Sequence, residues 1–424
     1  MSRLDELIQE MCLDGVEYCL FEDVCQYVRG ITYNKHDEIN IDGVDGECVL
    51  RANNITLESN TVNFDDVKRV RFGVKIKDTQ RLKKNDILIC AGSGSKEHIG
   101  KVAFIDIDSV YTFGGFMGVI RCDKTRLEPR YLFHIMTSPI FKNHLRKVSG
   151  GNSSTINNIN NDTWKNFEVP VPPLEVQREI VRVLDNFTLL RAELSAELSA
   201  RRKQYDEYLN KLLDIATLEP SKIMSVGELF EIKNGLNKEK SAFGKGTPIV
   251  NFTDVFNKRY LTADMIKGKV TLSENEIERY RVRKGDVFFT RTSETKEEIG
   301  MSSTVVDDIP DCTFSGFILR ARPLTGLLIP KFCAYYFSTN QVRDSIIRYA
   351  SFTTRATTSG SKLSKIPVPI IPISEQERIV SILDRFDILC TDISSGLPAE
   401  IEARTKQYEY YRDKLLSFKR KETA

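Results

Sequence analysis

The chain contains one structural unit twice, and this duplication restricts its fold more than any other feature. Corresponding positions lie 199 to 201 residues apart along the 424-residue sequence. Residues 81–100 and 281–300 agree at eight of twenty positions, and residues 169–187 and 368–386 agree at nine of nineteen. Because a fixed period implies the same order and spacing of elements in both halves, we expect two similar domains related by an approximate internal twofold.

Both halves have the same coarse layout. A region rich in Val, Ile, Phe, Gly and Asn comes first, with ILIC (87–90) and VFFT (287–290) as buried strands entered through a Lys-rich turn. Short amphipathic helices, a polar loop, a Pro-punctuated strand and a long helix follow. Two shorter echoes support this alignment, namely TFGGF from 112 with TFSGF from 313, and Gly30 with Gly235. The expected class is α+β, with two similar α/β domains and two long helices.

The two long helices carry coiled-coil seams. In the first, about residues 174–214, mostly apolar and aromatic residues, together with Arg191 and Arg201, follow a strict 4-3 alternation from Ile180 to Leu212. The second has one slip beside Gly396 and Pro398, which predicts either a stutter in the supercoil or a break and restart of the helix. Each apolar stripe needs a partner, and the other helix of the same chain can provide it. We therefore expect an antiparallel pair.

Composition places the chain among soluble, intracellular proteins. Hydrophobic residues make up 41% and charged residues 28%, with a net charge of +2. No run of eighteen apolar residues or secretory signal is present, so we expect a cytoplasmic protein with no membrane contact. The nine cysteines form no CxxC pair. We therefore expect reduced thiols and no metal site.

The sequence contains no recognisable set of catalytic residues. The four histidines all lie in the first half, although a duplicated enzyme would be expected to duplicate its catalytic groups; they are His36, His98, His134 and His144. There is no phosphate-binding G-x-x-x-x-G-K-[ST] loop and no Asn/Asp-Pro-Pro-aromatic methylase run. We expect no catalytic residues and no cofactor bound by this chain.

The repeated segments closely resemble the specificity subunits of type I restriction–modification systems. The resemblance rests on VQREIVRVLDNF and SEQERIVSILDRF, on the helix ends ARRKQYDEY and ARTKQYEYY, and on the strands KNDILIC and KGDVFFT. It implies target-recognition domains at 1–170 and 215–369, with conserved spacer helices at 171–214 and 370–420. Each domain would read one half of an asymmetric, split target in double-stranded DNA. The partners implied are two methyltransferase subunits, which use S-adenosylmethionine, and translocase–nuclease subunits.

Polar loops are the candidates for DNA contact, because base edges and phosphates are read by Arg, Lys, His, Asn, Ser and Thr. In each half, one loop follows the matched strand and another precedes the Pro-rich strand. The first-half candidates are Ser93, Ser95, Lys96, His98, Ser153, Thr155, Asn157 and Asn158. The second-half candidates are Arg291, Thr292, Ser293, Thr295, Lys296, Thr354, Arg355, Thr357, Thr358 and Lys362. Any one of them can equally be a solvated loop residue.

Other polar and aromatic positions have different expected roles. The pairs Lys83-Lys84 and Arg283-Lys284 match across domains that should read different bases, so we expect them to form strand-entry turns or phosphate contacts. Residues 419–421 look like a frayed, solvated tail. The seam tyrosines either fill the seam or dock a partner protein; they are Tyr205, Tyr208, Tyr408 and Tyr411.

Two other functional classes remain open at the level of sequence. A stand-alone DNA-modifying enzyme would need the catalytic motifs that are missing here. A coiled-coil scaffold would leave two large domains with polar loops unexplained.

Overall fold

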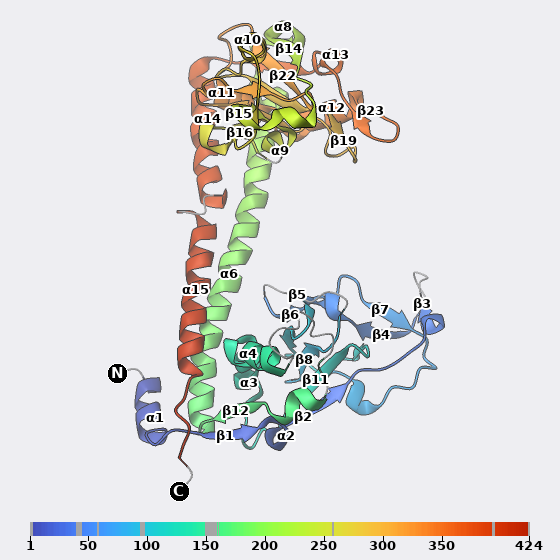
Figure 1. Ribbon diagram of the computed structural model, residues 1–424, viewed down its shortest axis with the longest axis vertical. Coiled ribbons are helices and arrows are strands. Elements are labelled where there is room, and N and C mark those ends of the chain that lie inside the picture. Colours follow the sequence, from blue (N-terminus) through green and yellow to red (C-terminus); the bar gives the residue numbers. More distant parts are fainter. Residues whose placement is uncertain are drawn as a thin grey trace. The chain divides into compact units, whose positions relative to one another are not determined.

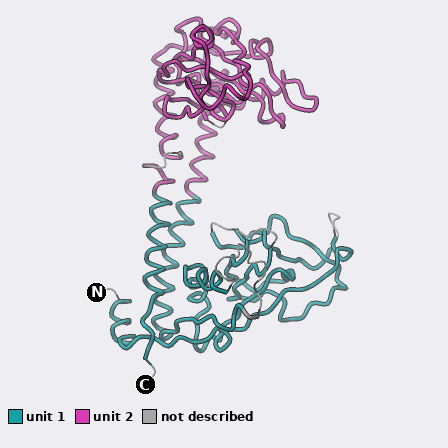
Figure 2. Tube along the Cα trace, viewed as in Figure 1, with its two compact units in different colours: residues 1–196, 400–424 teal, residues 197–399 magenta. Residues whose placement is uncertain are grey.

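The computed structural model divides the chain into two compact units, residues 1–196 with 400–424, and residues 197–399 (Figure 2). It describes residues 3–39, 45–56, 59–93, 98–148, 159, 161–256, 258–391 and 395–422. The helix α6 (Leu174–Leu212) is continuous across the boundary between Ala196 and Glu197. Unit 1 is therefore assembled from both ends of the chain, whereas unit 2 is one continuous segment.

Unit 1 is built around a four-stranded sheet of order β2-β11-β8-β9, all antiparallel (Figure 1). A second sheet has the order β10-β4-β7-β3, and β1 pairs with β12. The strands are β1 (Glu17–Leu20), β2 (Cys25–Arg29), β3 (Glu38–Ile39), β4 (Glu47–Leu50), β5 (Ile55–Thr56), β6 (Thr61–Val62), β7 (Lys68–Val70), β8 (Ile87–Cys90), β9 (Val102–Phe104), β10 (Thr112–Phe113), β11 (Met117–Cys122) and β12 (Glu168–Val171). The helices are α1 (Arg3–Met11), α2 (Phe21–Val24), α3 (Pro129–Thr137), α4 (Pro139–Val148) and α5 (Asn161–Lys165).

Unit 2 repeats this plan with a five-stranded sheet of order β14-β22-β18-β20-β16. Smaller sheets have the orders β17-β15-β21, β19-β24-β23 and β13-β25. The strands are β13 (Lys222–Ser225), β14 (Phe230–Asn234), β15 (Phe243–Val250), β16 (Tyr260–Leu261), β17 (Lys269–Val270), β18 (Val287–Thr290), β19 (Thr292–Ser293), β20 (Ser302–Val305), β21 (Thr313–Phe314), β22 (Ile318–Pro323), β23 (Ser351–Phe352), β24 (Ala356–Thr357) and β25 (Pro367–Ile370). The helices are α7 (Ile215–Leu218), α8 (Val226–Leu229), α9 (Phe252–Val255), α10 (Glu274–Tyr280), α11 (Pro330–Tyr336), α12 (Asn340–Tyr349) and α13 (Gly360–Leu363).

The matched strands β8 and β18 are the central buried strands of their sheets, as their continuous apolar sequences predict. All four residues of each strand are buried. Each is flanked by the strand that follows the T-F-x-G-F echo, because β11 pairs with β8 and β22 pairs with β18. The duplication in the sequence is therefore a duplication of the central sheet.

The long helices form antiparallel pairs within each unit. In unit 1, Phe187 of α6 stacks on Tyr411 of α15 (Leu397–Leu415), and Arg191 lies over the Tyr408 ring. In unit 2, Tyr208 of α6 stacks on Phe386 of α14 (Ile373–Thr391). The second long helix ends at Thr391 and restarts at Leu397, so the break is confirmed over the stutter. Pro398 fits the first turn, where its missing N–H has no intrahelical partner.

The tail at 419–421 is exposed, as predicted, but it is not frayed, and that part of the prediction is wrong. Val16 donates to the Lys419 carbonyl and accepts from the Lys421 amide, both at 2.9 Å. The Arg420 guanidinium pairs with Glu168 and lies over the Tyr18 ring. A short basic run has no intrinsic preference for order, so its pairing with the start of the chain is visible only in the tertiary structure.

Candidate nucleic-acid interface

The two polar loops predicted in the second half lie side by side in unit 2. Thr292 and Ser293 form β19, which pairs antiparallel with Ala356–Thr357 of β24. The Thr358 amide also donates to the Arg291 carbonyl at 3.0 Å. β24 in turn pairs with β23, so residues about sixty positions apart share one small sheet (Figure 1). This sheet continues directly from the end of the central strand β18, which fixes its position on the unit.

The predicted residues of this sheet divide by exposure. The side chains of Ser293 and Thr358 are buried, at 8% and 4% exposed. Thr292, Thr357 and Lys362 are half-buried. The exposed members are Arg291, Thr295, Lys296, Thr354 and Arg355. The exposed group is the most accessible to a nucleic acid, and it contains three cations.

Local contacts orient these cations to different degrees. Arg355 makes a 3.5 Å ion pair with Glu294 between two well-exposed side chains, which is a weak interaction. The Lys296 ammonium lies 5.3 Å from the centre of the Phe352 ring. Among the residues that the structure describes, no carboxylate pairs with the Arg291 guanidinium. Arg291 is therefore the cation whose charge is most available to an anionic ligand.

In unit 1, the predicted Ser93 and His98 line a cavity of about 670 Å³. Its other polar walls come from β2 and the segment after it, from β3, and from the segment after β4; they are Arg29, Thr32, Tyr33, Glu38, Arg51 and Asn53. The Ile159 amide donates to the Ala91 carbonyl at 2.6 Å, which repeats the contact between Thr358 and Arg291 in unit 2. The remaining predicted residues, Ser95, Lys96, Ser153, Thr155, Asn157 and Asn158, lie outside the described residues.

An aromatic residue missing from the sequence prediction lies beside each of these sites. Phe116 and Phe317 are 66% and 67% exposed, and each closes the T-F-x-G-F echo. The Phe116 carbonyl accepts from the Ala91 and Gly92 amides, and the Phe317 carbonyl accepts from the Arg291 amide. The repeated T-F-x-G-F segment is the sequence signal from which these two phenylalanines could have been predicted. For Arg29, Arg51 and Asn53 the sequence offers no comparable pattern.

The strand-entry turn before each site is held by a buried carboxylate. Asp86 accepts two bonds from Arg121, both at 2.8 Å, and one from the Lys83 amide at 2.9 Å. Asp286 repeats this with Arg322 and the Arg283 amide. The Lys-rich pairs are therefore turn residues, as predicted, because their backbone caps the carboxylate.

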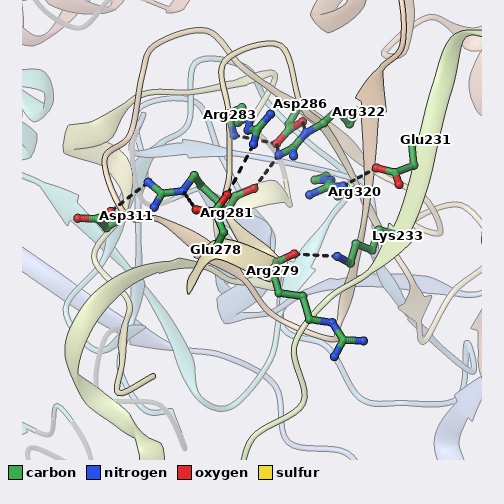
Figure 3. A network of polar contacts seen from close by, with 10 residues as sticks. All are labelled: Glu231, Lys233, Glu278, Arg279, Arg281, Arg283, Asp286, Asp311, Arg320 and Arg322. Atoms are coloured by element: carbon green, nitrogen blue, oxygen red, sulfur yellow. Dashed lines mark hydrogen bonds and ion pairs between the residues drawn. The ribbon is translucent and has the colours of Figure 1, made fainter. Parts of the chain in front are cut away.

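In unit 2 this turn belongs to a larger polar network (Figure 3). Arg281 pairs with Glu278 and with Asp311, and its carbonyl accepts from Arg322 at 2.6 Å. The neighbouring Arg320 is 2% exposed and pairs with Glu231. Burial and the Arg320 charge lower the pKa of Lys233, which donates to the Arg279 carbonyl. The network links β14, α10 and β22 to the turn that precedes β18.

Several titratable groups in the described part of the chain are buried and have shifted pKa values, but they do not form a metal centre. No cluster of three metal-binding side chains occurs there. Burial raises the pKa of the Cys90 thiol to about 11 and that of Cys312 to about 12, which disfavours reactive thiolates. Burial also lowers the pKa of His134, which bonds to Asp185 and Tyr408 inside unit 1. These groups are parts of the core.

The four seam tyrosines divide into two pairs. Tyr205 and Tyr408 are 5% and 7% exposed and fill the cores of their units. Tyr208 and Tyr411 are exposed by 42% and 36% and stack on Phe386 and Phe187. Tyr208 and Tyr411 occupy the same position of the repeat, so the helix pair of each unit has one exposed tyrosine at its surface.

Comparison with known proteins decides the family. The type I restriction modification DNA specificity domain matches the chain twice, at residues 14–201 and 219–403. The chain belongs to this family. The two matches follow the internal repeat and together extend over most of the sequence. The specificity subunit is a DNA sequence-recognition protein, and the catalytic activities of type I systems reside in partner subunits. The alternatives of a stand-alone enzyme or a scaffold are not favoured.

Individual relatives agree with this assignment. The specificity subunit of the type I restriction enzyme EcoKI from Escherichia coli is 27% identical, over 84% of this chain and 79% of its own length. That of EcoR124I/EcoR124II from Escherichia coli is 32% identical, over 63% of this chain and 66% of its own length. A solved structure of the type I R-M system, reported for its complex assembly and conformational transition, aligns with a TM-score of 0.62. That alignment has 16% identity and covers 95% of this chain and 97% of the other. The structural likeness supports the fold.

No helix among the described residues of the specificity subunit is long and apolar enough to cross a membrane.

Proposed function

We propose that each unit of this specificity subunit reads one half of a bipartite, asymmetric target in double-stranded DNA. The reading surface of unit 2 is the exposed group at the β19-β24-β23 sheet, with Arg291 at its centre. In unit 1 it is the cavity lined by Ser93, His98 and Arg29. Arg can make bidentate bonds to guanine, and Ser, Thr and His can bond to base edges or phosphates.

One observation carries this proposal: both units repeat one buried frame of paired strands and capped turns, whereas several residues of the loops that follow the central strands differ. The central strands and the carboxylate-capped turns are repeated almost unchanged. In these loops, the buried Ala91 stands where the second unit has the exposed Arg291, and the buried Gly92 stands where it has the half-buried Thr292. A shared frame with different loops is the arrangement expected when two domains bind the same kind of ligand with different sequence preferences.

The helix pairs are the proposed docking sites for two methyltransferase subunits. Large apolar residues are exposed at matched positions, Leu189 at 59% and Ile388 at 54%. Tyr208 and Tyr411 provide a second matched and exposed pair. Two equivalent surfaces on one chain suit two copies of one partner, because the same patch can be recognised twice. Translocase–nuclease subunits would join through that assembly.

The reaction itself would take place on these partners. We propose that S-adenosylmethionine binds to the methyltransferase subunits and that this chain binds no cofactor. We also propose a cytoplasmic location, where the DNA substrate lies and where reducing conditions suit the nine cysteines, which are free thiols in the structure.

The test is to exchange one reading domain and to sequence the methylated sites. The chain would be co-expressed with its methyltransferase, and adenine methylation would be mapped across the genome. A split, asymmetric motif is expected. Replacement of residues 1–168 by the corresponding segment of another specificity subunit should change one half of that motif and leave the other unchanged. A change in both halves would contradict the assignment of one half-site to each unit.

A further inference from the structure

The exposed rings of Phe116 and Phe317 are the least expected surface feature shared by both units. A single exposed apolar residue is ordinary on a protein surface. Here, however, two large rings occupy the same position of the repeat and are exposed to nearly the same extent, 66% and 67%. Arg291, whose amide donates to the Phe317 carbonyl, has Ala91 as its counterpart beside Phe116, so this neighbour differs between the units while the ring is the same. A large ring that is exposed in both units indicates a contact that both units need to make.

The backbone holds each ring in a defined place. The Met117 amide donates to the Gly114 carbonyl at 2.7 Å, and the Ile318 amide donates to the Ser315 carbonyl at 3.2 Å, which closes a tight turn around each Phe. The Phe carbonyl then accepts from the loop that follows the central strand, so its position is tied to that of the reading loop. The backbone of each Phe is therefore held at a fixed position relative to the loop that is proposed to read bases.

The matched glycines, Gly30 and Gly235, explain why the chain can pass so close to these turns. A Cβ atom on Gly30 would lie 2.1 Å from the Gly114 carbonyl oxygen, and one on Gly235 would lie 2.0 Å from the Ser315 carbonyl oxygen. Only glycine allows the end of β2 or β14 to cross the turn at this distance. The same crossing brings Arg29, which donates to the Gly115 carbonyl at 3.1 Å, beside Phe116.

We propose that Phe116 and Phe317 contact bases of the DNA target directly, with one ring in each half-site. This inference rests on the proposed function of the reading surfaces. The surroundings favour DNA over a protein partner, because a cationic residue lies close to each ring along the chain or in the cavity. Phe116 adjoins Arg29 and Ser93 in the cavity of unit 1, and Phe317 is bonded through its carbonyl to Arg291. Phe side chains contact bases by stacking or by wedging between base steps.

Because the ring is common to both units, its contribution should be affinity rather than choice of sequence. A ring that wedges between two base steps of a duplex meets the π face of a base, and every base has such a face. The charged and polar tips around the ring would then select the bases. This predicts that removal of one ring weakens binding to all targets without changing the preferred motif.

The experiment uses the complex of this chain with its methyltransferase subunits and a duplex carrying the motif found by methylation mapping. Phe116→Ala and Phe317→Ala should each weaken binding by about tenfold or more, because loss of one base–aromatic stack has an effect of that order. The slope of log affinity against log salt should stay unchanged, since no phosphate contact is lost. Phe72→Ala is the matched control, because Phe72 is equally exposed at 68% and has no Phe at its counterpart in unit 2.

A spectroscopic variant gives an independent test. The chain has one tryptophan, Trp164, which is buried in unit 1. Phe116→Trp or Phe317→Trp would add an exposed indole whose emission is distinct and should be quenched when cognate DNA stacks on it. Absence of quenching, unchanged affinity of both alanine variants, or an equal loss in Phe72→Ala would overturn the inference. Loss of methyltransferase binding in the alanine variants would assign the rings to a protein interface and would also overturn it. If the unaltered complex shows no preference for any DNA motif, the proposed function itself fails.

Discussion

The buried pair of Asp86 and Arg121 offers the most direct test of the repeated frame. We expect Asp86→Ala to destabilise unit 1 strongly, because the Asp86 side chain is 3% exposed and that of Arg121 only 20%. The change removes two charge-assisted hydrogen bonds at 2.8 Å and the acceptor for the Lys83 amide. It also leaves the guanidinium without a counter-charge. Removal of one partner of such a pair costs about 3–5 kcal/mol.

Trp164 makes the effect measurable in unit 1 by itself. It is the single tryptophan of the chain, and its ring stacks on Phe21 and Phe141 in the unit 1 core. Urea unfolding followed by its fluorescence should show a midpoint lower by about 1–2 M, given a slope of about 2–3 kcal/mol per molar. Asp78→Ala is the control, because Asp78 is the exposed partner of Lys83 in the same turn. It should leave the midpoint unchanged.

A double substitution separates the effect of the unpaired charge on stability from the effect of the smaller side chain. Asp86→Ala with Arg121→Met replaces the pair by apolar groups and should recover part of the lost stability, since no unpaired charge remains buried. If the midpoint of Asp86→Ala stays within experimental error of the unaltered chain, the argument that this carboxylate holds the turn is refuted. The same would follow if the control lowered the midpoint as much.

Three further outcomes are expected. If Arg291 reads a guanine, Arg291→Ala should cost about 1–3 kcal/mol of binding free energy and relax the sequence preference of one half-site. Methylation mapping that shows unchanged discrimination at every target position would remove Arg291 from the reading surface. Gly235→Ala should destabilise unit 2 by about 1–3 kcal/mol or more in thermal unfolding, because its Cβ would overlap the Ser315 carbonyl, whereas Gly326→Ala meets nothing within 4 Å and should be neutral. Burial lowers the pKa of His134, so unit 1 should lose stability as pH falls below about 6.5, where the unfolded chain binds a proton that the folded chain excludes. His134→Gln should flatten this dependence of Trp164 unfolding between about pH 7 and 5, and an unchanged slope would contradict the assignment.

The sequence by itself determined the parts of this protein that depend on local pattern. The duplication, the buried strands ILIC and VFFT, the Lys-rich turns and the two long helices all follow from periodicity and turn chemistry. The interruption at Gly396–Pro398 was visible for the same reason, although the sequence left a stutter and a break as equal alternatives. These features need no knowledge of distant contacts, and the strands and helices of the structure reproduce them.

The tertiary structure decided which polar residues can serve as a site. Nothing local distinguishes Ser293 and Thr358, which β-pairing and the core bury, from the exposed Arg291 and Thr354. The same holds for the seam tyrosines, since Tyr205 and Tyr408 face the cores while Tyr208 and Tyr411 remain at the surface. Which side chains remain exposed is set by segments that lie about sixty or two hundred residues away, and a short sequence window does not contain that information.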